Sequence, residues 1–156
     1  FLLTGSIFDL KNSMELAHAN DKILMVNIDL VSGIAYDRDG IRYLAENDLC
    51  DGIISTKGYL IKEASKCGLM TIQRVFLLDS ASLNSAERSL NSKTVDAVEI
   101  LPGIAAPYFI EKQKDNGYNY PVIAGGLIQS KNEVKDLKKK GVFAVSTSKH
   151  QLWQYN

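Results

Sequence analysis

Short apolar runs alternate with amphipathic stretches along the whole chain. The runs span four to eight residues with few charges, which is typical of parallel strands that are buried on both faces. They lie at residues 1–4, 23–29, 52–56, 69–76, 97–101, 122–125 and 143–147. Between them, apolar side chains recur at helical spacing, as at Leu10, Met14 and Ala17. The pattern therefore predicts seven βα units.

The stretch PVIAGGLIQSKNEV at 121–134 places two glycines directly after a predicted strand. Gly125 and Gly126 lack a Cβ, so a ligand could approach the main chain closely, although a plain strand-to-helix turn also uses such residues. Ser130 and Glu133 fit a capping box, and Gly141 fits the end of the same helix. A helix is expected between them.

Seven βα units fit either an open doubly wound sheet or a (β/α)8 TIM-type barrel that lacks its first strand. The barrel explains more, because barrels commonly bind phosphate with the loops after their last two strands. Gly125-Gly126 follow the second-last predicted strand, and Thr147-Ser148 end the last, before a short helical tail, KHQLWQY. We therefore expect one barrel domain over residues 1–156, incomplete at its N-terminus because it starts at Phe1. Its phosphate site would comprise Gly125, Gly126, Thr147 and Ser148.

Polar residues also occur at the ends of other predicted strands, where barrels place their sites. The candidates are Asp29, Gln73, Arg74 and Glu99. Asp29 could instead cap a helix, and Arg74 could form a structural ion pair with Glu99 because a buried arginine needs an anion. Ser55, Thr56 and Lys57 could cap a helix or contact a ligand.

Motifs typical of catalysis are missing from the chain. It has no nucleophile elbow, no Walker loop and no metal-ligand spacing, and His18 and His150 lie on predicted helices, where solvation is the simplest interpretation. Two function classes remain: a non-catalytic sensor of a phosphorylated polyol, or a phosphosugar-type barrel enzyme with Asp29 or Glu99 as general base.

Composition changes this picture only for nucleic acid. The 156 residues include 18 basic and 18 acidic side chains, so nucleic-acid binding would need a local patch. One helix supplies the candidate lysines Lys131, Lys135, Lys138, Lys139 and Lys140, which could also be a solvated face. No apolar run is long enough to span a membrane. Cys50 and Cys67 are expected to be buried thiols in a cytoplasmic protein.

Five motifs in order resemble the glycerol uptake operon antiterminator family. They are DGIISTKGYLIKEA (51–64), TIQRVFLLDSASL (71–83), VEILPGI (98–104), PVIAGGLIQSKNEV (121–134) and AVSTSKHQLW (144–153). The resemblance implies a (β/α)8-type barrel that binds glycerol 3-phosphate, without a cofactor or metal, and acts on leader mRNA to let transcription pass a terminator. It places phosphate at Gly125-Gly126 and Thr147-Ser148 and the polyol around Asp29, Gln73, Arg74 and Glu99. It favours the sensor over the enzyme and leaves homo-oligomerisation open.

The chain departs from the family pattern at two places. It reads Thr4-Gly5-Ser6 where the family usually has an acidic residue, Thr and His, and it has Asn27 where the family often has His. Asn27 can donate and accept hydrogen bonds, but it does not titrate near neutral pH. The effector contacts of this chain are therefore expected to differ in detail. An occupied phosphate site is further expected to order the start of the lysine-bearing helix.

Overall fold

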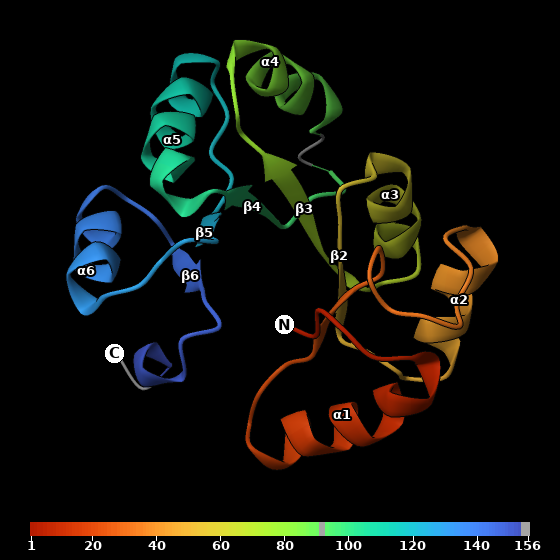
Figure 1. Cartoon of the computed structure of the whole chain (residues 1–156). Helices are drawn as coiled ribbons and strands as arrows, with labels where there is room; N and C mark the ends of the chain where they lie inside the picture. Colours follow the sequence, from red (N-terminus) through yellow and green to blue (C-terminus); the bar gives the residue numbers. More distant parts are fainter. Residues whose placement is uncertain (91–92, 154–156) are drawn as a thin grey trace. The chain divides into compact units, whose positions relative to one another are not determined.

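The computed structural model describes residues 1–90 and 93–153 as strands that alternate with helices (Figure 1). The strands are β1 (Met25–Asn27), β2 (Gly52–Ser55), β3 (Met70–Phe76), β4 (Ala97–Leu101), β5 (Val122–Gly125) and β6 (Ala144–Ser146). The helices are α1 (Ile7–Ala19), α2 (Arg38–Glu46), α3 (Gly58–Lys66), α4 (Ser80–Ser89), α5 (Ala106–Asp115) and α6 (Lys131–Lys139), with 3-10 turns η1 (Gly103–Ala105) and η2 (His150–Leu152).

The strands are neighbours in chain order, β1-β2-β3-β4-β5-β6. A doubly wound sheet reverses its order in the middle, so that alternative is wrong. An all-parallel α/β fold with one helix after each of β1 to β5 is what the apolar runs predicted. Of the short tail KHQLWQY, residues 150–152 form η2, while residues 154 and 155 lie outside the described part of the chain.

The barrel of seven units is not confirmed, because residues 1–4 do not form a strand. Only Leu2 pairs, by a single parallel bridge to Val26, and its backbone bonds to Met25 and Asn27. Phe1 and Leu3 are 47% and 42% exposed, so the segment lacks the two-sided burial that its apolar composition suggested.

The chain divides into two compact units. The first comprises residues 1–73 and 91–96, and within it β1 pairs with β2 and β2 with the start of β3, all parallel. Helix α3 packs against α2 and against β2 (Figure 1). The core of this unit is aliphatic, and its fully buried side chains include Val26, Ile41, Ile53 and Leu60.

The second unit comprises residues 74–90 and 97–156. Here β4 pairs with β5 and β5 with β6, and Gly125 lies opposite Ser146 in the register. Helices α5 and α6 lie on one face of these strands (Figure 1). Val98, Ile100, Ala124 and Phe109 form the centre of its core. Because parallel strands end at the same edge, the loops after β4, β5 and β6 gather there.

Predicted helix starts and ends are largely confirmed. Ser130 and Glu133 form the expected capping box at the start of α6, and Gly141 follows its end with a φ of +89°. Asp79 caps α4 by accepting a hydrogen bond from the Ser82 N–H. Asp29, in contrast, does not cap α2, which begins nine residues later with Asp37 as its cap.

The cysteines and histidines differ in part from the expectation. Cys50 is buried, but Cys67 is exposed because it stands at the C-cap of α3, beyond the buried face of that helix. His18 lies on α1 and approaches the Asp51 carboxylate at 3.0 Å. His150 lies on η2 with its ring 4.4 Å from that of Trp153.

Candidate functional site

The loop after β5 carries the two glycines that the sequence singled out. A Cβ on Gly125 would lie 2.7 Å from Oε1 of Glu99, so any larger residue here would displace the Glu99 carboxylate. Gly126 has a φ of +73°, in the left-handed region that other residues rarely adopt. Leu127 follows with a φ of +60°, which is unusual for a branched side chain. The backbone is therefore held in an uncommon conformation at the end of β5.

A neighbouring loop locks this conformation in place. The Gly103 N–H, just after β4, donates to the Gly126 carbonyl at 3.2 Å. A Cβ on Gly103 would lie 2.9 Å from Cδ1 of Ile128, so the two loops touch where a side chain would separate them. The loop at Pro102-Gly103 thus packs directly against the glycine loop. Backbone strain that is over-determined by its surroundings is common at ligand sites.

The loop after β6 joins the same edge. The Thr147 hydroxyl donates to the Ile128 carbonyl at 3.3 Å and accepts from the Lys149 N–H at 3.1 Å. The Thr147 carbonyl accepts from Nε1 of Trp153 at 2.7 Å, which ties the loop to the residue that follows η2. Ser148 is exposed. The structure therefore brings the Gly125-Gly126 and Thr147-Ser148 loops together, and Thr147 uses its hydroxyl to join them.

Arg74 and Glu99 form a buried ion pair beneath these loops. Nε of Arg74 lies 2.6 Å from Oε2 of Glu99, and the two side chains are 8% and 1% exposed. The predicted pairing is confirmed. The other carboxylate oxygen of Glu99 faces the backbone of Gly125, as the close approach there shows. A charged pair thus lies directly against the glycine loop.

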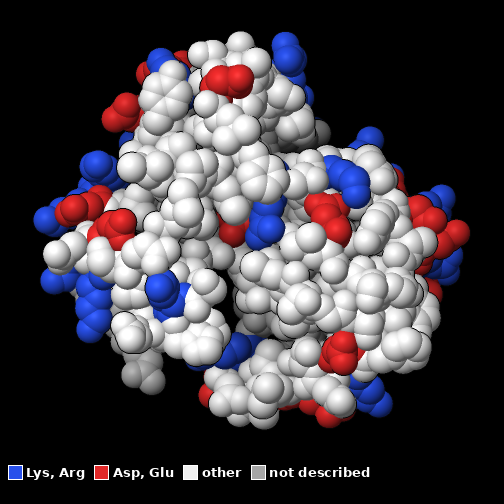
Figure 2. Space-filling model, viewed as in Figure 1, with Lys and Arg blue, Asp and Glu red and all other residues white. Residues whose placement is uncertain are grey.

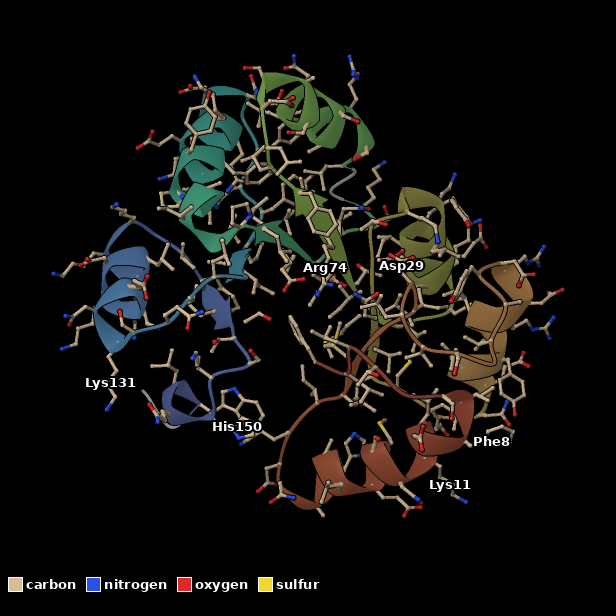
Figure 3. The ribbon with its side chains drawn as sticks, in the orientation of Figure 1. Phe8, Lys11, Asp29, Arg74, Lys131 and His150 are labelled. Atoms are coloured by element: carbon tan, nitrogen blue, oxygen red, sulfur yellow. The ribbon has the colours of Figure 1, made fainter. Side chains whose placement is uncertain are left out.

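The first unit carries a second cluster at the ends of its strands, around Asp29 (Figure 3). Oδ1 of Asp29 accepts from the Ser55 hydroxyl at 2.9 Å and from the Lys57 ammonium at 3.2 Å. Oδ2 accepts from the N–H and the hydroxyl of Thr56, at 2.7 and 3.0 Å. A carboxylate has about four acceptor positions, so these bonds occupy the group fully.

Lys57, for which the sequence left capping and ligand contact open, joins this cluster. Its ammonium lies 3.2 Å from Asp29 and 4.7 Å from the centre of the Tyr36 ring, a cation–π arrangement. Gln73 lies beside this cluster, where its side-chain amide donates to the carbonyls of Ser55 and Thr56. The signal was present in Ser55, which ends β2, and in Thr56 and Lys57, which follow it, but the sequence could not show that Asp29 faces them.

The same cluster determines the protonation of Asp29. Burial disfavours its charged form, but the hydrogen bonds from Thr56, Ser55 and Lys57 together outweigh burial and lower the pKa of the carboxyl. A carboxylate with a lowered pKa and filled acceptor positions is a weak general base.

No group of three or more His, Cys, Asp or Glu side chains among the described residues could hold a metal ion. Within the same residues, no helix is both long and apolar enough to cross a membrane.

Comparison with known proteins extends over nearly the whole chain. The model of the family described as glycerol-3-phosphate responsive antiterminator matches residues 1–153. The uncharacterised protein YgcP of Escherichia coli K12 is 30% identical over 155 residues, which cover 97% of this chain and 78% of that protein.

Two solved structures share the fold. The glycerol uptake operon antiterminator regulatory protein of Listeria monocytogenes strain 4b F2365 is 33% identical, with a TM-score of 0.87 over 98% of this chain and 82% of that one. A glycerol uptake operon antiterminator-related protein of Thermotoga maritima MSB8 is 32% identical, with a TM-score of 0.87 over 98% and 86%.

Proposed function

Because the chain belongs to the family of glycerol-3-phosphate responsive antiterminators, we propose that it binds glycerol 3-phosphate and acts on leader mRNA to allow transcription of glycerol-utilisation genes. The observation that carries the proposal is the glycine loop after β5. Its backbone lies on a buried carboxylate that a Cβ at Gly125 would displace, and it turns in the left-handed region at Gly126. Such loops bind phosphate because backbone N–H groups can reach the oxygens without an intervening side chain.

In this proposal the phosphate binds between the two loops that Thr147 joins. Gly125 and Gly126 contribute backbone on one side, and Thr147 and Ser148 contribute backbone and hydroxyl groups on the other. Since Thr147 already donates to Ile128, the exposed hydroxyl of Ser148 is the better donor to the ligand.

The polyol hydroxyls would bind at the charged pair. Arg74 supplies N–H donors and Glu99 supplies acceptors, which matches groups that both donate and accept. The ion pair orients both side chains in the ligand-free protein, so binding costs little side-chain entropy. Contacts from Asp29 and Gln73 remain a prediction that stems from the resemblance.

The enzyme alternative has less support. Asp29 is the wrong kind of carboxylate for a general base, because its pKa is lowered and its oxygens are occupied. Glu99 is held by Nε of Arg74 at 2.6 Å, so one of its carboxylate oxygens is engaged in an ion pair. The family description names a regulator.

Calorimetric titration with glycerol 3-phosphate tests the proposal on a matched pair of variants. Gly126→Val places a side chain on the phosphate loop, whereas Gly117→Val places the same side chain at nearly the same backbone angle, with φ values of +73° and +76°. Gly117 lies between α5 and β5, where a Cβ meets no atom within 4 Å. Both variants carry the strain of a Val in the left-handed region, so strain alone cannot make them differ. Only Gly126→Val should lose affinity, because only its side chain stands on the phosphate loop.

We expect a loss of about tenfold or more for Gly126→Val, equivalent to at least about 1.4 kcal/mol, and wild-type affinity for Gly117→Val. Equal affinities in all three proteins would remove the glycine loop from the binding site. Glycerol without phosphate serves as the second ligand, and it should bind far more weakly. Product analysis of the same mixtures tests the enzyme alternative, which predicts turnover of the ligand.

A further inference from the structure

Five large apolar residues of the second unit are exposed at the edge where its strands end. Phe76 ends β3, Leu78 follows it, Ile104 and Tyr108 follow β4, and Leu127 follows β5, and each is between 50% and 83% exposed. We call this set the apolar rim. Because η1 runs directly into α5, Ile104 and Tyr108, four positions apart, are neighbours on one helical surface. Figure 2 shows mostly uncharged surface over the ends of β3, β4 and β5 as Figure 1 labels them.

Backbone hydrogen bonds between neighbouring loops hold the rim together. The Leu77 N–H, after β3, donates to the Leu101 carbonyl at the end of β4, at 2.8 Å. The Gly103 N–H, after β4, donates to the Gly126 carbonyl after β5, at 3.2 Å. In each of the three loops, the residue that directly follows Leu77, Gly103 or Gly126 is an aliphatic member of the rim. The exposed aliphatic side chains therefore come from three loops that are bonded side by side.

Folding of the isolated chain does not account for this surface. Leu127 has a φ of +60° and is 76% exposed, so it carries the strain of a left-handed backbone without the benefit of burial. A large apolar residue presents about 200 Å² when it is fully exposed, so the whole rim presents about 600–700 Å². Monomeric soluble proteins rarely expose contiguous apolar patches larger than a few hundred Å². The rim therefore has the size of a surface that contacts another molecule.

We propose that the apolar rim pairs with the same rim of a second copy of this chain in a twofold dimer. A twofold interface brings one surface against itself, and an uncharged apolar surface can meet itself without repulsion. The 18 basic and 18 acidic side chains cancel, so no net charge opposes the approach of a second copy. A standard interface covers about 800 Å² of each partner, and the rim supplies most of that area. Neither the effector nor RNA is needed for this contact.

Sedimentation velocity of the wild type and of matched double variants tests the dimer. The wild type should be mostly dimeric at about 100 µM, as a Kd of about 10 µM or tighter requires. Leu78→Glu with Ile104→Glu places like charges on both facing rims, and Leu78→Lys with Ile104→Lys does the same with the opposite sign. Each of these rim variants should be a monomer at the same concentration, because like charges that face each other across an interface repel.

A control variant carries the same change of charge away from the rim. Phe8→Glu with Phe143→Glu alters residues that are 89% and 74% exposed, one in α1 of the first unit and one before β6, at the opposite end of the strands. This variant should remain a dimer. Thermal unfolding checks that all the variants fold, which the exposure of the four positions leads us to expect.

An equal mixture of the Glu and Lys rim variants separates self-association from contact with a different partner. Opposite charges then face each other, so the mixture should regain the dimer that neither variant forms alone. A mixture that stays monomeric would overturn the inference, as would equal loss of the dimer in the control variant. A wild type that is monomeric throughout would also overturn it, whether or not the rim binds another protein or a lipid vesicle.

Discussion

Replacement of the Arg74–Glu99 pair separates a structural role from a ligand-binding role. Arg74→Met leaves the Glu99 carboxylate 1% exposed and without the guanidinium that lies 2.6 Å from it. Breaking a buried pair on one side costs about 3–5 kcal/mol, because one charge stays buried without compensation. For a chain of this size each kcal/mol lowers the melting temperature by about 2–4 °C, so we expect a decrease of about 6–20 °C.

The double variant Arg74→Met with Glu99→Met removes both charges and keeps apolar volume. Replacing a buried ion pair by packed apolar side chains is often neutral or stabilising, by up to about 4 kcal/mol. The double variant should therefore regain the wild-type melting temperature. It should still bind glycerol 3-phosphate poorly, because the donors and acceptors for the polyol are gone.

The assay is thermal unfolding of the wild type, both single variants and the double variant, followed by calorimetric titration of the folded ones. The single variants should each be much less stable than the double variant. Wild-type affinity in a stable double variant would refute the ligand role of the pair and leave a structural ion pair. Stability of the Arg74→Met variant within about 1 kcal/mol of the wild type would refute the energetic argument itself.

Three further outcomes follow from the structure. Asp29→Asn should lower stability at neutral pH; because the wild-type pKa is lowered, the difference in melting temperature should shrink as the pH falls below the ordinary value of 3.8. A thiol reagent at pH 7 should modify Cys67 in the folded protein and spare Cys50, whose pKa burial raises to about 12, as intact-mass spectra would show. Gly125→Ala should destabilise by about 1–3 kcal/mol in denaturant unfolding, because its Cβ would displace Glu99.

The apolar runs predicted strands well where both faces are covered. The predicted strands at 97–101 and 122–125 agree with β4 and β5 residue by residue. Residues 1–4 have the same apolar character, but a local pattern cannot show whether a neighbouring strand covers them. The alternation of strands and helices was predictable because local composition reports the propensity of each segment. The strand expected at residues 1–4 was not, because strand pairing depends on contacts distant in sequence.

The sequence predicted which residues lie at the strand ends, but it predicted less well which of their side chains bond to one another. Arg74 and Glu99 were paired correctly, because a buried arginine requires an anion and adjacent strands supply few. The Asp29 cluster was missed, since its partners lie 26 to 28 residues further along the chain. Cys67 followed the correct helical spacing but stands at the last turn, where burial ends.

The capping box of α6 constrains how an effector could be sensed. Glu133 accepts hydrogen bonds from the Gln129 N–H, the Ser130 N–H and the Ser130 hydroxyl, at 2.8, 2.7 and 2.9 Å. Ser130 and Glu133 thus bond to each other's backbone at the start of the helix, which weighs against the expectation that phosphate binding orders it. We therefore expect a signal from Gly126 to reach α6 as a rigid-body displacement about the left-handed pair Gly126-Leu127. For a helix of about 13 Å, a rotation of about 10° at its start moves the far end by about 2 Å. Amide hydrogen exchange within α6 should accordingly be the same with and without effector, while the lysines at its end change position.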